Sequence, residues 1–414
     1  MLPGAIRRHA ILGGGIAGLT CAYALKGRGA DVVVFEAASR PGGRSDAGVP
    51  YLLSPEVSRN TLKLIEELGI ANEVIPIEPH AGQVYKGKIY RHRVASATGL
   101  LRFKGLNIAD KALLPRMAYL LARLGPSLDF HHPERGVSLD DETVASFIKR
   151  ELSQNILNYV AGPLISTLFF YGSEETSRLL YLLLARHMYN TRMSTVRGGF
   201  GRVVGLLSDK LPIVHRPIDS IAMDGDRYVI NDERFSDVVI AVNGDGVLKI
   251  RGLADLLSEQ DREFFQNCRY QRVVNVAVRT QQPVDGGCYA VSIPRVENMR
   301  AATISFIDYI DPSRIPYGEG LLVVSGGGPE ASQSHLMDDV RRLYRVDPKF
   351  AETSEWESGM PKFPPGRYRQ IAAFKERSRR PGLFFCGDYL MGPFVEAAVT
   401  TGLTAATEIQ QRGV

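Results

Sequence analysis

A glycine-rich turn near the start of the chain limits the fold more than any other feature. A short apolar segment runs directly into Gly13-Gly14-Gly15-Ile16-Ala17-Gly18, and a stretch with helical periodicity follows. A second apolar segment, residues 31–35, ends at Glu36, at the spacing of roughly 20 residues typical of dinucleotide-binding units. This order of strand, glycine turn, helix, strand and acidic residue predicts a βαβ unit that binds a dinucleotide.

Each residue of this unit has its own expected role. Gly13 permits the tight turn, Gly15 lets the backbone approach a pyrophosphate, and Gly18 lets the helix pack closely on the strand. The helix N-terminus attracts the phosphates, and Glu36 accepts a hydrogen bond from a ribose hydroxyl. A turn that binds nothing is the alternative, and the register of strand, helix and acidic residue argues against it. The predicted cofactor-binding residues of this unit are Gly13, Gly15, Ile16, Ala17, Gly18, Glu36 and Ala37.

Two arginines and a glycine pair follow Glu36, in the segment Arg40-Pro41-Gly42-Gly43-Arg44. Guanidinium and backbone N–H groups at this position can meet phosphate, whereas a simple nicotinamide site has no need of them. The segment resembles the FAD-binding signature of the amine oxidase and protoporphyrinogen oxidase superfamily of flavoproteins. The resemblance implies FAD as the cofactor and adds Arg40, Gly43 and Arg44 to its contacts, with a solvated basic loop as the lesser interpretation.

The C-terminal part of the chain carries a second match to this superfamily. An apolar strand ends in Gly387-Asp388, and Phe394 precedes a helix that begins at Val395. The resemblance implies that Asp388 holds a ribityl hydroxyl of FAD. The free amides of the helix would stabilise negative charge at N1 and C2=O of the reduced flavin. The residues that this match places against the cofactor are Gly387, Asp388, Phe394, Val395 and Ala398.

Two further positions resemble the superfamily. Ile218 stands where its members present a strand residue's backbone to the adenine, although an ordinary core residue is nearly as good an interpretation. Trp356 and Met360 lie in the segment that runs along the flavin in its members. Because Met360 replaces the flavin-linking cysteine of monoamine oxidases, we expect noncovalent FAD. Trp356 and Phe394 are the residues expected at the catalytic centre, with a packing role as an equal alternative for Trp356.

The reaction is constrained less tightly than the cofactor. Amine oxidases of the superfamily commonly carry a lysine near the flavin N5, and residues 270–280 contain none. We expect an FAD-dependent oxidoreductase, protoporphyrinogen oxidase-like or amine oxidase-like, that removes hydride from a small or lipophilic substrate and reduces oxygen or a quinone. A desaturase or isomerase of a carotenoid-type substrate is the alternative. A flavin-free lipid-escort protein of the GDP-dissociation inhibitor type is a third interpretation, and the intact glycines, Glu36 and Asp388 argue against it.

Length and pattern predict the domain organisation. A chain of 414 residues exceeds the ~250 to 300 residues that a single core supports. We expect an α/β fold, with a Rossmann-like FAD-binding domain of the GR2 type and an inserted α+β substrate domain. The FAD-binding domain is expected at 1–80, 195–255 and 351–414, and the substrate domain, a helical insert plus a sheet, at 81–194 and 256–350.

Composition narrows the partners. The net charge is +5, but lysines and arginines form no dense block, so we expect no nucleic acid partner. The 4 cysteines are scattered without a CxxC pair, which indicates neither a metal site nor a disulfide framework. With no signal-peptide pattern and no apolar run of transmembrane length, we expect a cytoplasmic protein. The Leu-rich, basic insert leaves peripheral membrane contact open.

Overall fold

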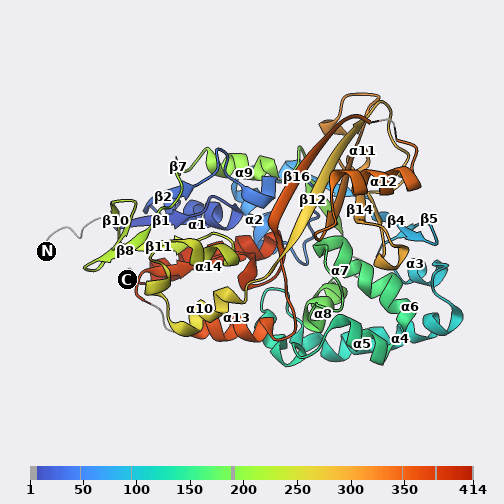
Figure 1. Cartoon of the computed structure of the whole chain (residues 1–414), viewed down its shortest axis with the longest axis horizontal. Coiled ribbons are helices and arrows are strands. Elements are labelled where there is room, and N and C mark those ends of the chain that lie inside the picture. Colours follow the sequence, from blue (N-terminus) through green and yellow to red (C-terminus); the bar gives the residue numbers. More distant parts are fainter. Residues whose placement is uncertain are drawn as a thin grey trace.

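The structure is a computed structural model that describes residues 7–46, 48–94, 96–187, 192–346, 348–377 and 380–412. The molecule is elongated, and two halves lie side by side (Figure 1). One half is built around a parallel sheet. The other contains a second sheet and a group of helices.

Five parallel strands among the described residues form the centre of the first half. They are β1 (Arg8–Leu12), β2 (Asp31–Glu36), β7 (Ile213–His215), β11 (Asp237–Ile240) and β17 (Leu383–Phe385). Their order in the sheet is β17-β11-β1-β2-β7, and each neighbouring pair is parallel. The central strands are nearly continuous apolar runs because both faces of the sheet are covered.

Helices cover one face of this sheet. They are α1 (Ile16–Lys26), α2 (Arg59–Glu67), α9 (Gly201–Ser208) and α14 (Val395–Gln411). Ile11, Val34 and Val239 point to this face and share one apolar cluster with them. Helices α1 and α14 meet in backbone contact, since a Cβ at Gly402 would lie 2.4 Å from the Ala17 carbonyl oxygen.

The opposite face packs on a small antiparallel sheet and two helices. These elements are β8 (Ile221–Asp224), β9 (Arg227–Ile230), β10 (Glu233–Phe235), α10 (Glu259–Gln266) and α13 (Arg367–Glu376). Leu12, Phe35 and Ile240 belong to the apolar cluster on this side. The parallel sheet is therefore buried on both faces, as the prediction of a Rossmann-like domain requires.

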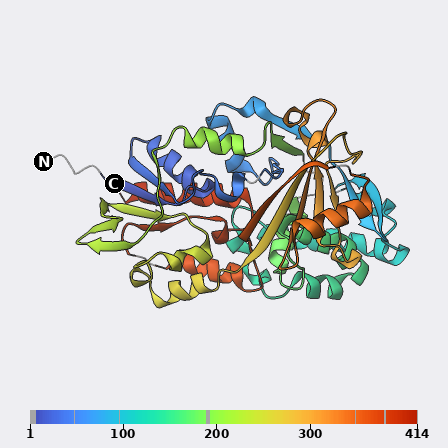
Figure 2. The same ribbon diagram turned by 45° about the horizontal axis from the view of Figure 1, so that its top comes forward.

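The second half is built on a sheet of order β16-β12-β15-β14-β13-β4-β5. Its strands are β4 (His80–Tyr85), β5 (Lys88–Arg93), β12 (Tyr270–Thr280), β13 (Ala290–Ser292), β14 (Ala301–Phe306), β15 (Gly320–Gly327) and β16 (Pro348–Pro361). Helix α12 (Gln333–Leu343) packs on one face of it. The long strands β12 and β16 reach back towards the first half (Figure 2).

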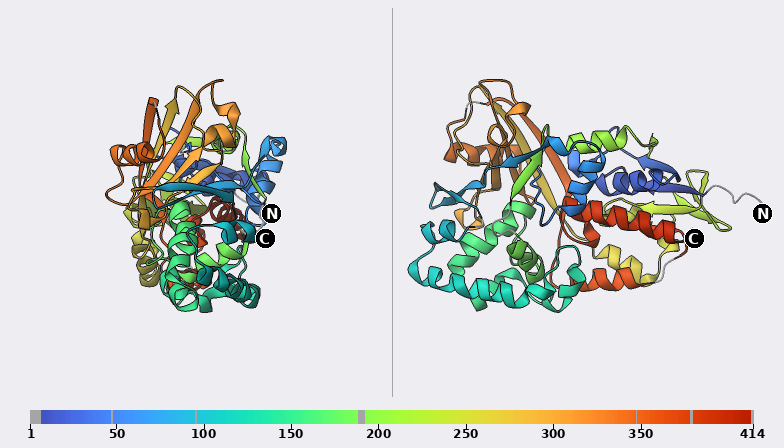
Figure 3. Two further views of the ribbon diagram at one scale, coloured as in Figure 1. Left: turned by 90° about the vertical axis from the view of Figure 1, so that its right-hand side faces the viewer. Right: turned by 180° about the vertical axis from the view of Figure 1, so that it is seen from behind.

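Helices from the middle of the chain gather on one side of this sheet. The left view of Figure 3, which looks along the long axis of the molecule, shows this arrangement. These helices are α3 (Ala97–Arg102), α4 (Ile108–Leu124), α5 (Val144–Glu151), α6 (Gln154–Ile156), α7 (Gly162–Phe169) and α8 (Arg178–His187). Residues 179–184 are all buried, so this Leu-rich stretch is core. No helix of the described residues is long and apolar enough to cross a membrane.

One predicted boundary needs correction. A domain border at residue 351 would fall inside β16, which pairs with β12 from Pro348 opposite Thr280 to Pro361 opposite Tyr270. The strand stays paired with β12 up to Pro361, and its last residues already contact the first half through the Gly359 carbonyl and Arg44. Charged and small residues dominate this strand, so no change in hydrophobic pattern marks where it begins. Strand β4 begins at His80, one residue before the border predicted there.

Candidate active site

The glycine turn between β1 and α1 has the tight geometry that the sequence predicts. Gly13 has φ +118°, a left-handed conformation that favours glycine, and its N–H donates to the Phe35 carbonyl at 2.9 Å. A Cβ at Gly18 would lie 2.0 Å from the Gly13 carbonyl oxygen. Side chains at these two positions would therefore displace the turn itself.

Gly15 differs from both, because the space beside it is open. A Cβ at this position would meet no atom within 4 Å. Gly15 is also the N-cap of α1, and no side chain caps the helix, so its first N–H groups face this space. An open, uncapped N-terminus next to a residue without a side chain fits the pyrophosphate of FAD. Ile16 and Ala17 would contribute through their backbone.

Glu36 ends β2 beside this turn, and its carboxylate is held from two sides. One oxygen accepts a hydrogen bond from the Gly14 N–H at 2.8 Å, and the other accepts one from the Ala38 N–H at 2.7 Å. Both bonds orient the carboxylate at the end of β2. Ala37 lies between Glu36 and the donor Ala38. The ribose contact of Glu36 stays a prediction, and its geometry is fixed before any cofactor arrives.

Replacing Glu36 by alanine should weaken FAD binding by about ten- to a hundredfold, since a hydrogen bond to a charged group contributes ~1.5 to 3 kcal/mol. The affinity can be measured by titrating the cofactor-free protein with FAD and following flavin fluorescence. Glu56→Ala serves as the control, because Glu56 is a half-exposed glutamate outside the βαβ unit. Equal affinities for all three proteins would mean that the ribose contact is assigned to the wrong residue.

Arg44 joins the two sequence matches, which lie at opposite ends of the chain. Its guanidinium contacts both carboxylate oxygens of Asp388, at 3.0 and 2.9 Å, in the bidentate manner typical of arginine. Burial, the largest single effect, lowers the pKa of Arg44, but the charge and hydrogen bond of Asp388 together with the nearby Tyr270 and Tyr51 raise the pKa above its ordinary value. The contacts of Arg44 with phosphate and of Asp388 with the ribityl chain stay predictions. In this structure the two residues bind each other.

Two more acceptors complete the surroundings of Arg44, and the sequence analysis missed one of them. The guanidinium donates to the Gly359 carbonyl of β16 and to Asn243 Oδ1, each at 3.0 Å. Asn243 lies just beyond the carboxyl end of β11, which ends at Ile240. It stands out in the sequence only as a departure from the proline that resembling proteins often have there. A polar residue at the carboxyl end of a parallel strand is itself a signal for a ligand site.

Ile218 lies in the segment after β7 and not within a strand. Its two neighbours are held by one side chain, because Asn231 accepts from the Asp219 N–H and donates to the Pro217 carbonyl, both at 2.9 Å. Among the described residues, the Ile218 backbone forms none of the backbone–backbone hydrogen bonds that lie outside helices and strands. A backbone contact with adenine remains a prediction that this geometry permits, and Asn231 is the residue that sequence reasoning did not find.

The closing helix α14 presents a second uncapped N-terminus. Phe394 is its N-cap residue, and no side chain caps the helix. The first free amides begin at Val395, whereas the Ala398 N–H already donates to the Phe394 carbonyl at 3.3 Å. Ala398 is also buried in the core, so no free N–H of this residue is left for its predicted cofactor contact. Gly387 donates its N–H to Thr401 Oγ1 at 3.0 Å, which fixes the strand end against the helix.

Phe394 extends from this helix end into the helical insert. Its ring centroid lies 4.7 Å from that of Phe130 and 5.5 Å from that of Phe169. Phe169 in turn stacks on Tyr171 at 5.7 Å. The N-terminus of α14 thus faces an aromatic cluster, defined as Phe130, Phe169, Tyr171 and Phe394.

Trp356 and Met360 both lie on β16, so the segment expected along the flavin is an extended strand. The Trp356 Nε1 atom is buried and has no hydrogen-bond partner among the described residues. An unpaired buried donor costs ~1 to 3 kcal/mol, which is consistent with a bound group as its partner. Met360 packs against the main core and offers no thiol to a flavin. The catalytic role of Trp356 stays a prediction.

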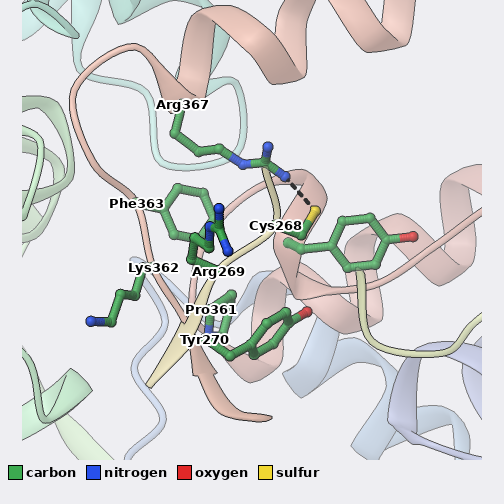
Figure 4. Close-up of a pocket in the computed structure, with 8 residues that line it drawn as sticks. Cys268, Arg269, Tyr270, Pro361, Lys362, Phe363 and Arg367 are labelled. Carbon is green, nitrogen blue, oxygen red and sulfur yellow. Dashed lines mark hydrogen bonds between the residues drawn. The ribbon is translucent and has the colours of Figure 1, made fainter. Parts of the chain in front are cut away.

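A small recess of about 160 Å³ lies where β12 begins and β16 ends (Figure 4). Figure 4 shows the Arg367 guanidinium directed at the Cys268 sulfur, 2.9 Å away. This volume includes space open to solvent, and no part of it has room for a water molecule, so the recess is not a ligand pocket. It contains no residue of the glycine turn. Tyr270 links the recess to the candidate site, since its ring centroid lies 5.7 Å from the Arg44 guanidinium. The recess is lined by Cys268, Arg269, Tyr270, Pro361, Lys362, Phe363, Arg367 and Tyr389.

The glycine turn, the fixed Glu36 carboxylate and the two uncapped helix ends define a Rossmann-like dinucleotide-binding protein. The family model described as "Flavin containing amine oxidoreductase" matches residues 16–410. The chain belongs to this family. The predictions of the superfamily, of the α/β fold and of FAD as the cofactor of an oxidoreductase are thereby confirmed.

Individual relatives are more distant. The chain is 26% identical over 172 residues to "Protoporphyrinogen oxidase 2, chloroplastic/mitochondrial" of Arabidopsis thaliana, and this match covers 38% of the chain. It spans 32% of that protein's length. A solved cyclohexylamine oxidase from Brevibacterium oxydans IH-35A has a TM-score of 0.76 at 19% identity, with 99% of each chain covered. Wild-type putrescine oxidase bound to putrescine has a TM-score of 0.78 at 18% identity, covering 98% of this chain and 99% of that one. At such identities these structures show the fold alone.

The expectation that the flavin is bound noncovalently leads to a direct prediction. Because Met360 supplies no thiol, acid precipitation of the FAD-loaded protein should leave the yellow colour in the supernatant. Absorbance near 450 nm in the two fractions measures the outcome. Flavin that stays with the washed precipitate would contradict the prediction and point to attachment elsewhere.

Proposed function

We propose that this chain is an FAD-dependent oxidoreductase that removes hydride from an apolar organic substrate held against the aromatic cluster. The observation that carries the proposal is the position of Phe394, at the N-cap of the helix expected to face the flavin and in ring contact with the insert. FAD, when bound, supplies the two-electron acceptor. The chain supplies orientation and exclusion of water.

The residues around this site favour a mechanism in which they position the substrate and the flavin, and none of them is proposed as a general acid or base. Strand β12 carries no lysine, and its first residue, Tyr270, has a pKa raised well above its ordinary value, mainly by burial and then by the charge of Asp388. The phenol accepts a hydrogen bond from the Gly244 N–H at 2.9 Å. A phenol held protonated in this way serves as a fixed hydrogen-bonding group and not as a base. The Val395 helix end would stabilise negative charge on the reduced flavin.

The choice of substrate favours protoporphyrinogen-type molecules over small amines. Phe130, Phe169 and Tyr171 are buried in the core, and the half-buried Phe394 is the ring of the cluster with an accessible face. A flat, apolar face of this kind suits a large unsaturated ring system. A charged amine would need an acceptor in this wall, and the four rings of the cluster provide only the Tyr171 hydroxyl. This hydroxyl donates to the Pro361 carbonyl at 3.2 Å, and Tyr171 is only 1% exposed, so its oxygen is out of reach of a substrate. Oxygen or a quinone would take the electrons from the reduced flavin.

Anaerobic mixing of the FAD-loaded protein with candidate substrates tests this proposal. Protoporphyrinogen IX should bleach the flavin absorbance near 450 nm, while putrescine and cyclohexylamine, the substrates in the names of the structural relatives, should bleach it slowly or not at all. Bleaching by the amines alone would overturn the preference. Absence of bleaching by every candidate, with normal bleaching by dithionite, would overturn the proposed substrate class.

One observation supports a second candidate, the desaturase or isomerase of a lipophilic substrate. Helix α4 exposes large apolar side chains, with 88% of Ile108 and 61% of Tyr119 accessible, next to Arg116 and Arg123. An amphipathic helix with basic flanks can lie on a membrane surface and receive substrates from it. A protein of this type would co-sediment with anionic vesicles, and phytoene in such vesicles would reduce its flavin.

Replacing Phe394 by alanine should slow reduction of the flavin by the true substrate more than tenfold, because the ring separates the flavin site from the insert. Reduction by dithionite should keep its rate, since it needs no wall for the substrate. Phe394 is half-buried, and loss of a fully buried ring can cost ~3 to 5 kcal/mol of stability, so samples must be folded and have equal flavin content. Phe350→Ala removes a ring that is 60% exposed on β16 and is the control. Wild-type kinetics in Phe394→Ala would place the substrate elsewhere.

A further inference from the structure

A buried carboxylate lies two residues beyond Phe394. Glu396 is only 3% exposed, and its carboxylate is surrounded by hydrogen-bond donors. One oxygen accepts from the Asn60 N–H and lies 2.9 Å from His131 Nε2, and the other accepts from the Thr61 N–H and hydroxyl at 2.9 and 2.7 Å. Thr400 Oγ1 adds a longer contact of 3.4 Å. A buried carboxylate is retained only when it is paired in this manner.

Two of these donors show that Glu396 caps a helix from outside. Asn60 and Thr61 lie in the first turn of α2, and the N-cap Ser58 makes no side-chain capping bond. The carboxylate from α14 therefore takes the place of a capping side chain on α2. The dipoles of both helices favour negative charge at this point. Glu396 is thereby anchored to the FAD-binding half without any contribution from the insert.

His131 is the contact that the insert adds. It lies in the loop between the turns Gly125–Ser127 and Pro133–Leu139, and its side chain is 11% exposed. Because a carboxylate accepts only, Nε2 carries the hydrogen and donates to Glu396. The neighbouring Phe130 ring meets Phe394 at 4.7 Å. Two adjacent residues of the insert thus contact two residues of the segment that begins α14.

We propose that His131 is a positioning residue: its hydrogen bond to Glu396 holds the insert on the start of α14 and fixes Phe130 against Phe394. The wall of the substrate site then depends on this bond. The role assigned to the wall rests on the proposed function, whereas the docking of the loop does not. The loop is also held by Asp129, which accepts from the His131 N–H, and by the buried Phe130 ring, but neither contact joins the loop to α14 through a directional bond. The bond to Glu396, which is directional, supplies this link.

Hydrogen exchange in the FAD-loaded protein tests the docking without any substrate. His131→Leu removes the donor and should speed exchange of the amides at 128–132 by about ten- to a hundredfold, as loss of a hydrogen bond to a charged group predicts. His131→Gln keeps a donor and should restore slow exchange. The matched control is His132→Leu, because His132 makes a similar contact with Glu134 at 3.1 Å but is 54% exposed. Equal exchange in His131→Leu and His132→Leu would overturn the docking.

The circular dichroism of the bound flavin in the visible region tests the placement of the wall. His131→Leu should change the spectrum, and His131→Gln and His132→Leu should match the wild type. An unchanged spectrum in His131→Leu, with exchange accelerated, would overturn the positioning role. Failure of the proposed function would give a different result. In that case no candidate substrate would bleach the flavin of the wild-type protein, although hydrogen exchange and circular dichroism of the variants behave as expected.

Discussion

Gly15→Ala is expected to reduce FAD affinity at least a hundredfold while the cofactor-free chain stays folded. The added Cβ meets no atom within 4 Å, and the φ of −70° at this N-cap suits any residue. The methyl group would occupy the space through which the backbone approaches the pyrophosphate. A hundredfold loss corresponds to about 2.7 kcal/mol. Fluorescence titration with FAD and thermal unfolding without FAD measure the two effects.

Gly18→Ala provides the contrasting control for this experiment. Its Cβ would lie 2.0 Å from the Gly13 carbonyl oxygen, so the turn must move and the apo protein should lose stability by about 1 to 3 kcal/mol or more. Loss of FAD binding in Gly15→Ala together with an unchanged unfolding temperature would separate the cofactor contact from the packing. If Gly15→Ala bound FAD like the wild type, the open space would not be the pyrophosphate site.

Arg44→Ala should lower the free energy of unfolding by about 3 to 5 kcal/mol. The substitution leaves the Asp388 carboxylate, 7% exposed, without its cation, and removal of one partner from a buried pair has an effect of this size. It also removes the bonds to Asn243 and to the Gly359 carbonyl, which tie the segment after β11 and the end of β16 to the segment that carries Arg44. Chemical denaturation of the cofactor-free protein measures the change.

Arg40→Ala is the comparison for Arg44→Ala, because it tests FAD binding by the same segment without a large effect on the stability of the protein. Arg40 is exposed and takes part in none of the ion pairs recorded among the described residues. Its loss should leave stability within about 0.5 kcal/mol, as is usual for surface substitutions, and should weaken FAD binding if the guanidinium meets phosphate. Equal destabilisation by both arginine substitutions would refute the idea that Arg44 acts as a structural link.

Local motifs made much of the cofactor site predictable. The glycine turn, Glu36 and the strand that ends in Gly387-Asp388 carry their geometry in a few consecutive residues. Backbone conformation and helix ends dictate such spacing. The general placement of these motifs in one half of the molecule follows from the βαβ pattern.

The residues that link distant segments could not be read in the same way. Asn231, Asn243 and the contact of His131 with Glu396 depend on which loops the fold brings together. Glu396 lies 265 positions from His131 in the chain, and no periodicity signals that separation. Similarly, charged and small residues dominate β16, so its sequence shows no clear strand pattern. Its pairing with β12 makes it a strand.

Titration of the cofactor-free protein with FAD tests the central claim most directly. The structure predicts one tight site per chain, with quenching of flavin fluorescence and a shift of its visible absorbance on binding. ADP, which shares the ribose and pyrophosphate, should compete, whereas FMN should bind far more weakly because it lacks the adenine half. Absence of a saturable site for FAD, or binding that ADP does not affect, would contradict the account.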